Sequence, residues 1–489
     1  MQARKLCAQS LPTTRDVRVR APRRLVALSE LAQLTSALAV LGLASIRVSA
    51  DTPERPAIAF NRWAEDWSVL ADPDVPREPL DELKYIRLSN NDARTYLSLG
   101  ANIRERFEVN DTNFGTGGNQ QDSYLLSRTE AHLDLRLHGQ VQVFFQLQSD
   151  MSPGKQRPSP VDQDRLSVEQ GFVAVSEPLG DGVVAIRIGR QENGFDLQRF
   201  LSVRDGPNVR QSYDGVSVAY TRGPWRFIAL YTHPVQNRNS SLFDDYSSPH
   251  LSLGLVRIER QVTSSSSLSA YVGQFRQDDA RFPSAIGNER RALVEVRYTG
   301  VSGRVDWDAE AMSQNGRIGA QAIHAWATGA IIGRTFGSAG FRPRISLQFD
   351  AASGDKSPTD HQLDTFNPLF PSGYYFTTAG NTTYANLVHV KADLSVNPLP
   401  NVKLSSGIGV EWRETVADAI YTLPDVPVPD TAGRGGRYVG TYGQFRADCG
   451  LTPHIALALE AVHFSAGATV VSVGGHDTNY FGAEVRYGW

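Results

Sequence analysis

Eight arginines in the first half of the chain carry the side chains best suited to bind a charged solute. A planar guanidinium donates two parallel hydrogen bonds to a carboxylate, whereas a lysine offers only a point charge. Lysines are rare, at six of the 49 basic residues. If these arginines line one passage, that passage would select anions. The eight are Arg104, Arg106, Arg128, Arg136, Arg190, Arg199, Arg204 and Arg210.

Two interpretations of these arginines remain open from the sequence. In the first, some of them form an anion-selective constriction, for which the best candidates are Arg128, Arg190, Arg199, Arg204 and Arg210. In the second, they pair with acidic residues and merely solvate an interior. The acids that could serve are Glu108, Glu130, Asp134, Asp205 and Asp214. Under the first interpretation, Arg→Glu at two of the positions would shift ion preference toward cations.

Other chemistry has weaker support. Acyl hydrolysis needs a serine, a histidine and an orienting acid or carboxamide, and the spacing of His463 and Ser465 is common in strands. Asp162 and Asp164 resemble the start of a calcium loop, but its glycine and distal glutamate are missing. Cys449 is the one cysteine outside the N-terminal region, so no disulfide is expected. We expect no catalytic residue, no metal and no cofactor, and a protein that is not an enzyme.

Residues 1–50 have the pattern of a cleavable signal peptide. Arginines precede an uncharged apolar run at 31–46, and the small residues at 48–50 resemble a cleavage site. This segment holds eight basic and two acidic residues, so its removal leaves 41 basic and 50 acidic residues, a net charge of −9. Such a balance argues against a nucleic-acid partner. Residues 51–93, rich in Pro, Asp and Glu, are expected to form a periplasmic lead-in or a plug.

From about residue 94 onward, apolar and polar residues alternate. In 125–137 the odd positions are mostly Leu, while the even positions from 128 onward are Arg, Glu, His and Asp. Neighbouring side chains of a strand point to opposite faces, so this segment has one apolar and one charged face. The pattern recurs at 141–148, 305–310, 341–350, 388–394 and 408–413.

Segment length favours a transmembrane barrel over a soluble sandwich. Several segments reach ten or more residues, as tilted membrane strands need, whereas soluble strands average about 5–6. A mean hydropathy of −0.31 excludes a bundle of apolar membrane helices. An open sheet of this size would expose its edges, which closure removes. We therefore predict an all-β, single-chain, antiparallel transmembrane β-barrel of about 16–18 strands over residues 94–489.

Loop lengths orient the predicted barrel. Long connections are expected at 191–213, 234–250, 351–384 and 414–437, and tight ones near 300–303 and 398–401. Long extracellular loops and short periplasmic turns are typical of outer-membrane barrels. The chain ends on an alternating strand with Trp489, where Phe is more usual. Such an ending is similar to the signal that the barrel-assembly machinery binds.

Five segments resemble the alginate export porin family. They are 65–72 (EDWSVLAD), 96–108 (YLSLGANIRERFE), 188–215, 348–371 and 410–421. The resemblance implies a barrel of about 18 strands in the bacterial outer membrane, surrounded by lipid, with an arginine-lined conduit. The expected cargo is an anionic polysaccharide or another anionic solute. The alternative is a general or substrate-specific nutrient-uptake porin for small carboxylates. Cargo, direction and oligomeric state stay open.

Overall fold

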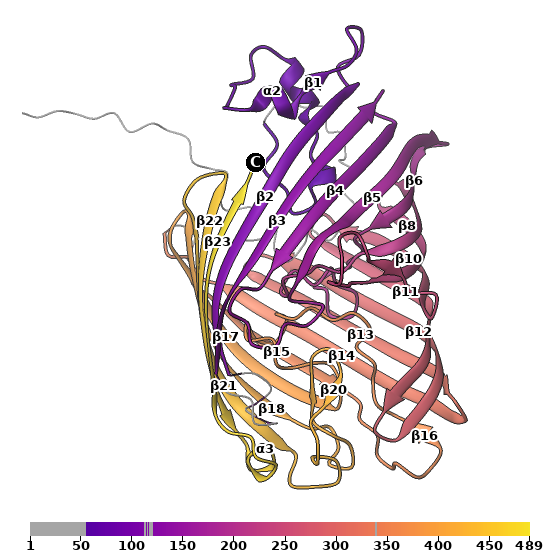
Figure 1. The fold of residues 1–489 in the computed structure, drawn as a ribbon, viewed down its shortest axis with the longest axis vertical. Coiled ribbons are helices and arrows are strands. Elements are labelled where there is room, and N and C mark those ends of the chain that lie inside the picture. The colour runs from indigo at the N-terminus through magenta and orange to yellow at the C-terminus, as the bar shows by residue number, and fades with distance from the viewer. Residues whose placement is uncertain (1–54, 112–113, 115, 117–120, 338–339) are drawn as a thin grey trace, which may run out of the picture.

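Alternating residues build the wall of a closed barrel. The computed structural model describes residues 55–489, except 112–113, 115, 117–120 and 338–339. Within this part of the chain, 18 long strands form an antiparallel sheet that closes where β2 pairs with β23 (Figure 1). Each long strand pairs with the next long strand along the chain. The predicted fold class and strand number are confirmed.

The long strands mostly exceed ten residues, as predicted. They are β2 (Tyr96–Asn110), β3 (Asp122–Leu137), β4 (Val141–Met151), β5 (Asp164–Leu179), β6 (Gly182–Gln191), β7 (Tyr213–Arg222), β8 (Trp225–Gln236), β10 (Leu251–Thr263), β11 (Ser266–Phe282), β12 (Ala285–Ser302), β13 (Val305–Ile318), β14 (Gln321–Thr335), β15 (Arg344–Ala352), β17 (Leu387–Leu399), β18 (Val402–Trp412), β21 (Tyr438–Gly450), β22 (Ile455–Ala466) and β23 (Thr478–Gly488). The short elements are η1 (Arg62–Ala64), η2 (Trp67–Ala71), α2 (Asp81–Lys84), β1 (Ile86–Arg87), β9 (Tyr246–Ser247), β16 (Gln362–Leu363), β19 (Tyr421–Thr422), β20 (Val426–Pro427) and α3 (Ala468–Ser472).

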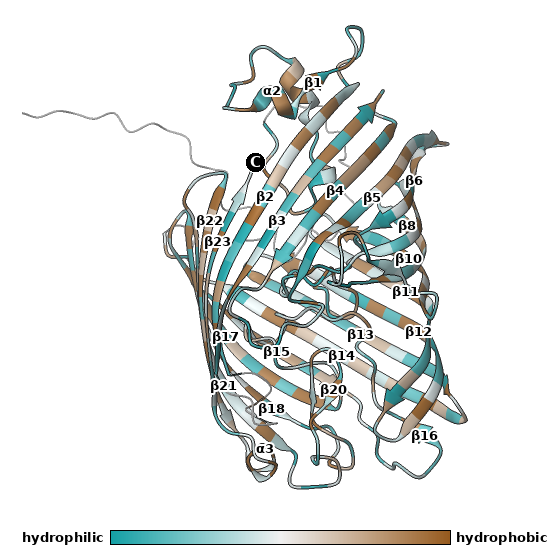
Figure 2. Cartoon of the chain, viewed as in Figure 1, coloured by the Kyte–Doolittle hydropathy of each residue, from teal (hydrophilic) through white to brown (hydrophobic). Residues whose placement is uncertain are grey.

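The two faces of the wall have opposite chemistry. On β2 the apolar Ile103 and Phe107 are 40% and 43% exposed on the outer face, while Arg104 and Arg106 are buried inside. The alternation shows as bands along the strands (Figure 2). Apolar residues outside and charged residues inside are the arrangement of a barrel that stands in lipid. Among the described residues, no helix is long and apolar enough to cross a membrane.

The two ends of the barrel also differ. The four predicted long connections join strands at one end of the wall, where β16, β20 and α3 also lie, and the predicted tight connections near 300–303 and 398–401 lie at the other, near α2 and the C-terminus (Figure 1). We call these the long-loop end and the short-turn end. One predicted strand is shorter than expected, because β15 begins at Arg344 and not at Phe341. Pro343 has no N–H to donate to a ladder, so it ends the pairing there.

The lead-in packs against the short-turn end. Trp67, Leu70 and Val75 form a small core with Tyr96 of β2. Trp63 reaches the inner face of the wall, where it packs with the inward side chains of β4 and β5. The predicted signal peptide, 1–50, lies outside the described residues.

Candidate lumen site

Two long connections fold into the barrel and pack against each other. We call residues 192–212, between β6 and β7, the first inner loop, and residues 353–386, between β15 and β17, the second inner loop. Leu201 and Phe370 form a parallel bridge between them, and Phe370 N–H donates to the Phe200 carbonyl at 3.0 Å. Tyr374 hydroxyl donates to the Gly206 carbonyl at 2.9 Å. The lumen is therefore narrowed by one joined structure and not by two separate loops.

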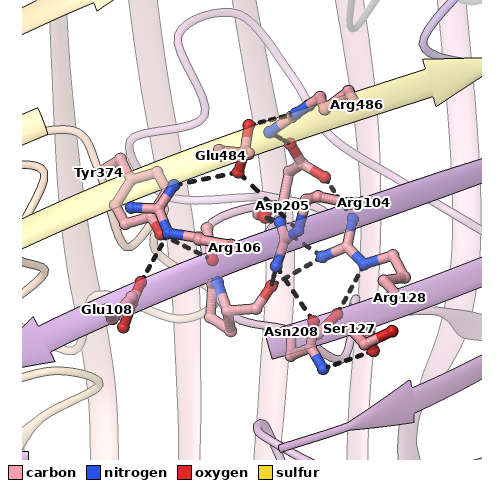
Figure 3. Close-up of polar contacts among 12 residues, drawn as sticks. Arg104, Arg106, Glu108, Ser127, Arg128, Asp205, Asn208, Tyr374, Glu484 and Arg486 are labelled. Atoms are coloured by element: carbon pink, nitrogen blue, oxygen red, sulfur yellow. Dashed lines mark hydrogen bonds and ion pairs between the residues drawn. The ribbon is translucent and has the colours of Figure 1, made fainter. Parts of the chain in front are cut away.

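Arg104 and Arg128 hold the first inner loop against the wall. Arg104 donates to the Asp205 carbonyl at 2.6 Å, and Arg128 donates to the Pro207 and Asn208 carbonyls, each at 2.7 Å (Figure 3). Arg128 also pairs with the Asp205 carboxylate at 2.6 Å. These guanidiniums bind mainly backbone oxygens, so they fix the loop's position.

Asp205 is the acidic centre of this contact. Burial alone would raise the pKa of its carboxyl, but Arg486, Arg128, Arg210 and Arg104 together hold that pKa well below its usual value. The Asp205 carboxylate is 3.1 Å from Arg486 of β23. The first inner loop thus carries a permanent negative charge into a cluster of arginines.

Arg106 lies in a cage of acids and aromatic rings. It pairs with Glu108 at 2.6 Å, Glu484 at 3.0 Å and Glu460, and its guanidinium lies over the Tyr374 ring (Figure 3). The side chain is 1% exposed. Four of the five Arg106 donors therefore have partners in the wall, and the group stabilises the wall.

Arg136 and Arg210 bind the lead-in. Arg136 donates to the Trp63 carbonyl at 2.5 Å and the Glu65 carbonyl at 3.1 Å, besides pairing with Asp134. Arg210 pairs with Glu192 at 2.7 Å, and its guanidinium lies 4.2 Å from the centre of the Phe60 ring. The lead-in therefore occupies positions beside two of the predicted lumen arginines.

Arg199 and Arg204 anchor the first inner loop to the wall and to the second inner loop. Arg199 pairs with Asp308 at 2.6 Å and Glu310 at 2.7 Å, and donates to the Tyr375 hydroxyl. Arg204 has a left-handed backbone, φ 52°, and its guanidinium lies over the Phe370 ring at 5.7 Å. Both contacts join the first inner loop to its surroundings.

Arg190 is separate from the other seven. It shares the outward parity of Ile186 and Ile188 on β6 and pairs with Asp214 of β7 at 2.8 Å. This ion pair lies at the long-loop end of both strands. The alternation around Ile188 indicates this placement, so the sequence already held the signal.

Two arginines outside the eight candidates, Arg187 and Arg226, have unused donors. Arg187 of β6 is 6% exposed, and no hydrogen bond or ion pair joins it to any residue in the described ranges. Its guanidinium is stacked on Trp63 at 3.8 Å and Phe172 at 4.4 Å. Arg226 of β8 contacts Glu259 at 3.4 Å, but its buried Nε and Nη2 have no partner there. The alternation in the sequence places both side chains on the inner face of the wall. It cannot show which inward arginines have no acidic partner nearby.

A small cavity lies beside Arg226, between the lead-in and the first inner loop. Phe60 and Trp63 line one side, and Glu192 and Asn193 line another. Asn193 is 8% exposed, and its amide nitrogen has no hydrogen-bond partner within the described residues. The cavity holds about 30 Å³, enough for one or two waters.

The serine and histidine considered for hydrolysis lie outside the lumen. His463 joins Ser465 at 3.3 Å and Asn479 at 2.9 Å on the outer face. Acyl transfer also needs donors for an oxyanion. The N–H that follows the serine, on Ala466, instead donates to the Asp477 carboxylate at 2.8 Å. A carboxylate at this position would repel an oxyanion.

An 18-strand barrel with an apolar outer face, a charged lumen and inward loops is a porin of the bacterial outer membrane. The sequence profile of the alginate export family matches residues 95–484, so the chain belongs to that family. The family and the fold are those of channels. The short-turn end is therefore periplasmic and the long-loop end extracellular.

Solved structures with the same fold include several outer-membrane porins of Pseudomonas aeruginosa. The outer membrane protein opdK has a TM-score of 0.54 at 11% identity, over 80% of this chain and 98% of its own. OccK11 (OpdR) has a TM-score of 0.52 at 10% identity, over 80% and 95%. OccK2 (OpdF), solved in complex with glucuronate, has a TM-score of 0.52 at 11% identity, over 80% and 97%. No curated protein matches the chain.

Proposed function

We propose that this outer-membrane channel passes anionic solutes, with an anionic polysaccharide or its uronate oligomers as the favoured cargo. The observation that carries the proposal is a pair of buried, incompletely paired arginines. Arg226 lines the cavity behind the lead-in, and Arg187 is covered by the ring of Trp63, which also lines that cavity. A buried donor without a partner costs free energy, which a carboxylate ligand would recover. The aromatic rings of Phe60 and Trp63 border the same space.

We further propose that the lead-in, 51–93, is a plug at the periplasmic mouth and that the barrel is a separate unit over 94–489. Backbone carbonyls of Trp63 and Glu65 take the donors of Arg136, and the Trp63 ring covers Arg187. The plug thus occupies the places that an anionic cargo would need. Displacing it would expose both arginines together.

The alternative function is uptake of small carboxylates. It is favoured by the fold shared with OccK2 (OpdF), solved in complex with glucuronate, and with OpdK, solved with vanillate. Glucuronate and vanillate are both small carboxylates. In either function we expect no catalysis, and assembly of the barrel through its C-terminal strand β23 by the barrel-assembly machinery.

A liposome-swelling assay separates these functions. Proteoliposomes that contain the protein would be diluted into solutions of glucuronate, a uronate tetramer or neutral glucose at equal osmolarity, and the rate of swelling would report the entry of each solute. Entry of both uronates faster than glucose supports the polysaccharide conduit. Entry of glucuronate alone supports the uptake porin. Equal entry of glucose and glucuronate would contradict an anion-selective lumen.

A further inference from the structure

Three carboxylates from separate parts of the chain meet on the inner face of the wall. Asp196 belongs to the first inner loop, Glu295 to β12 and Glu310 to β13. One carboxylate oxygen from each lies within 4.8 Å of the others. The side chains of Asp196, Glu295 and Glu310 are 7%, 0% and 4% exposed. A concentration of buried negative charge of this kind requires compensation.

Glu295 is the least compensated of the three carboxylates. Neither of its oxygens has a hydrogen-bond partner among the described residues, and Arg257 Nη1 stands 3.8 Å away. By contrast, Arg257 donates to both oxygens of Asp196 at 2.7 Å, and Arg199 pairs with Glu310 at 2.7 Å. The arginines of the cluster are thus engaged by its other acids.

The charges around the three carboxylates do not balance. The acids of the network are Asp196, Glu259, Glu295, Asp308 and Glu310. Its arginines are Arg199, Arg257 and Arg297, with Arg226 as a fourth at its edge. One or two negative charges are therefore in excess. Either a proton on a carboxyl or a bound cation must neutralise them.

We propose that Asp196, Glu295 and Glu310 bind one divalent cation, Ca²⁺, in the lumen. Oxygen-only ligands suit a hard cation, and oxygens that share a calcium ion at about 2.4 Å lie no more than about 4.8 Å apart. Calcium also tolerates an irregular ligand set better than magnesium does. The unpaired oxygens of Glu295 supply the ligand that no arginine occupies.

The bound ion would tether the first inner loop to the wall. Asp196 comes from that loop, whereas Glu295 lies on β12 and Glu310 lies on the adjacent strand β13, opposite Arg297. The ion would therefore join the first inner loop to the barrel wall at a further point, and it would help to fix the width of the constriction. This inference does not depend on which anion the channel carries.

Calcium titration of the purified barrel tests the site. The full chain in detergent, treated with EDTA and dialysed, would be titrated with CaCl₂ in a calorimeter. We expect one site per chain with a Kd below about 1 mM. Glu295→Gln keeps the shape of the side chain and should weaken binding at least tenfold. Glu177→Gln, at an exposed position of β5, is the matched control and should bind as the wild type.

Asp196→Asn gives an independent arm, because it changes a loop residue and leaves every strand intact. It should also weaken binding, and calcium should raise the melting temperature of the wild type but not of either site variant. Equal binding by the wild type and both site variants would show adventitious surface binding only. No binding by the wild type would show that a protonated carboxyl balances the cluster. Either result overturns the proposal.

Discussion

Replacing Trp63 by Ala should open the periplasmic mouth. The Trp63 side chain is 6% exposed, packs on Phe144 and Phe172, and covers the Arg187 guanidinium at 3.8 Å. Truncating a buried tryptophan costs about 3–5 kcal/mol, including the loss of a cation–π contact. At about 1.4 kcal/mol for each factor of ten, the docked lead-in would lose about a hundredfold to a few thousandfold in relative population.

Single-channel recording in planar bilayers measures this effect directly. The Trp63→Ala channel should spend a larger fraction of time in its highest conductance level than the wild type, and should prefer anions more strongly, because Arg187 is uncovered. Trp326→Ala is the matched control, since Trp326 faces outward and is 41% exposed. If Trp63→Ala conducts like the wild type while proteolysis shows the lead-in released, the lead-in is not the plug.

Three further results are expected. Burial above all lowers the pKa of Lys84 in the lead-in to about 7. Between pH 7 and 10.5 the docked lead-in therefore binds fewer protons than the free one. The free energy of docking should become more favourable as the pH rises through this window, by at most about 5 kcal/mol. Lys84→Met should remove this pH dependence of channel opening. Charge reversal of Arg187 and Arg226 together should shift reversal potentials toward cations, whereas Arg222→Glu, at an exposed periplasmic turn, should not. Arg106→Met should destabilise the barrel by about 3–5 kcal/mol in urea unfolding, because it leaves buried carboxylates unpaired. An unchanged midpoint of urea unfolding would contradict the structural role of Arg106.

The wall of the barrel could be predicted from the sequence because its physics is local. Alternation depends only on neighbouring residues. The inner and outer faces of β3 and the positions of the four long connections could therefore be predicted from the sequence. Local chemistry also explains two departures from expectation: Pro343 delays the start of β15, and Arg190, expected in the lumen, has the outward parity of Ile188 on β6. Resemblance to the family narrowed the strand number.

The lumen could not be predicted in the same way. Arg128 meets Asp205, which lies 77 residues later, because an entire loop folds inward. Nothing in the local sequence distinguishes an arginine that has a distant acidic partner from Arg187, which has no acidic partner among the described residues. The pairing of each guanidinium is decided by loop packing, and only the structure shows it.

The reversal potential in a salt gradient tests the central claim most directly. The wild type and a variant lacking residues 51–67 would be compared in planar bilayers with potassium chloride and potassium glucuronate. We expect the wild-type channel to be anion-selective and glucuronate to carry current. We expect this anion selectivity to increase when the lead-in is removed. A cation-selective or unselective pore in both proteins would contradict an arginine-lined anion channel.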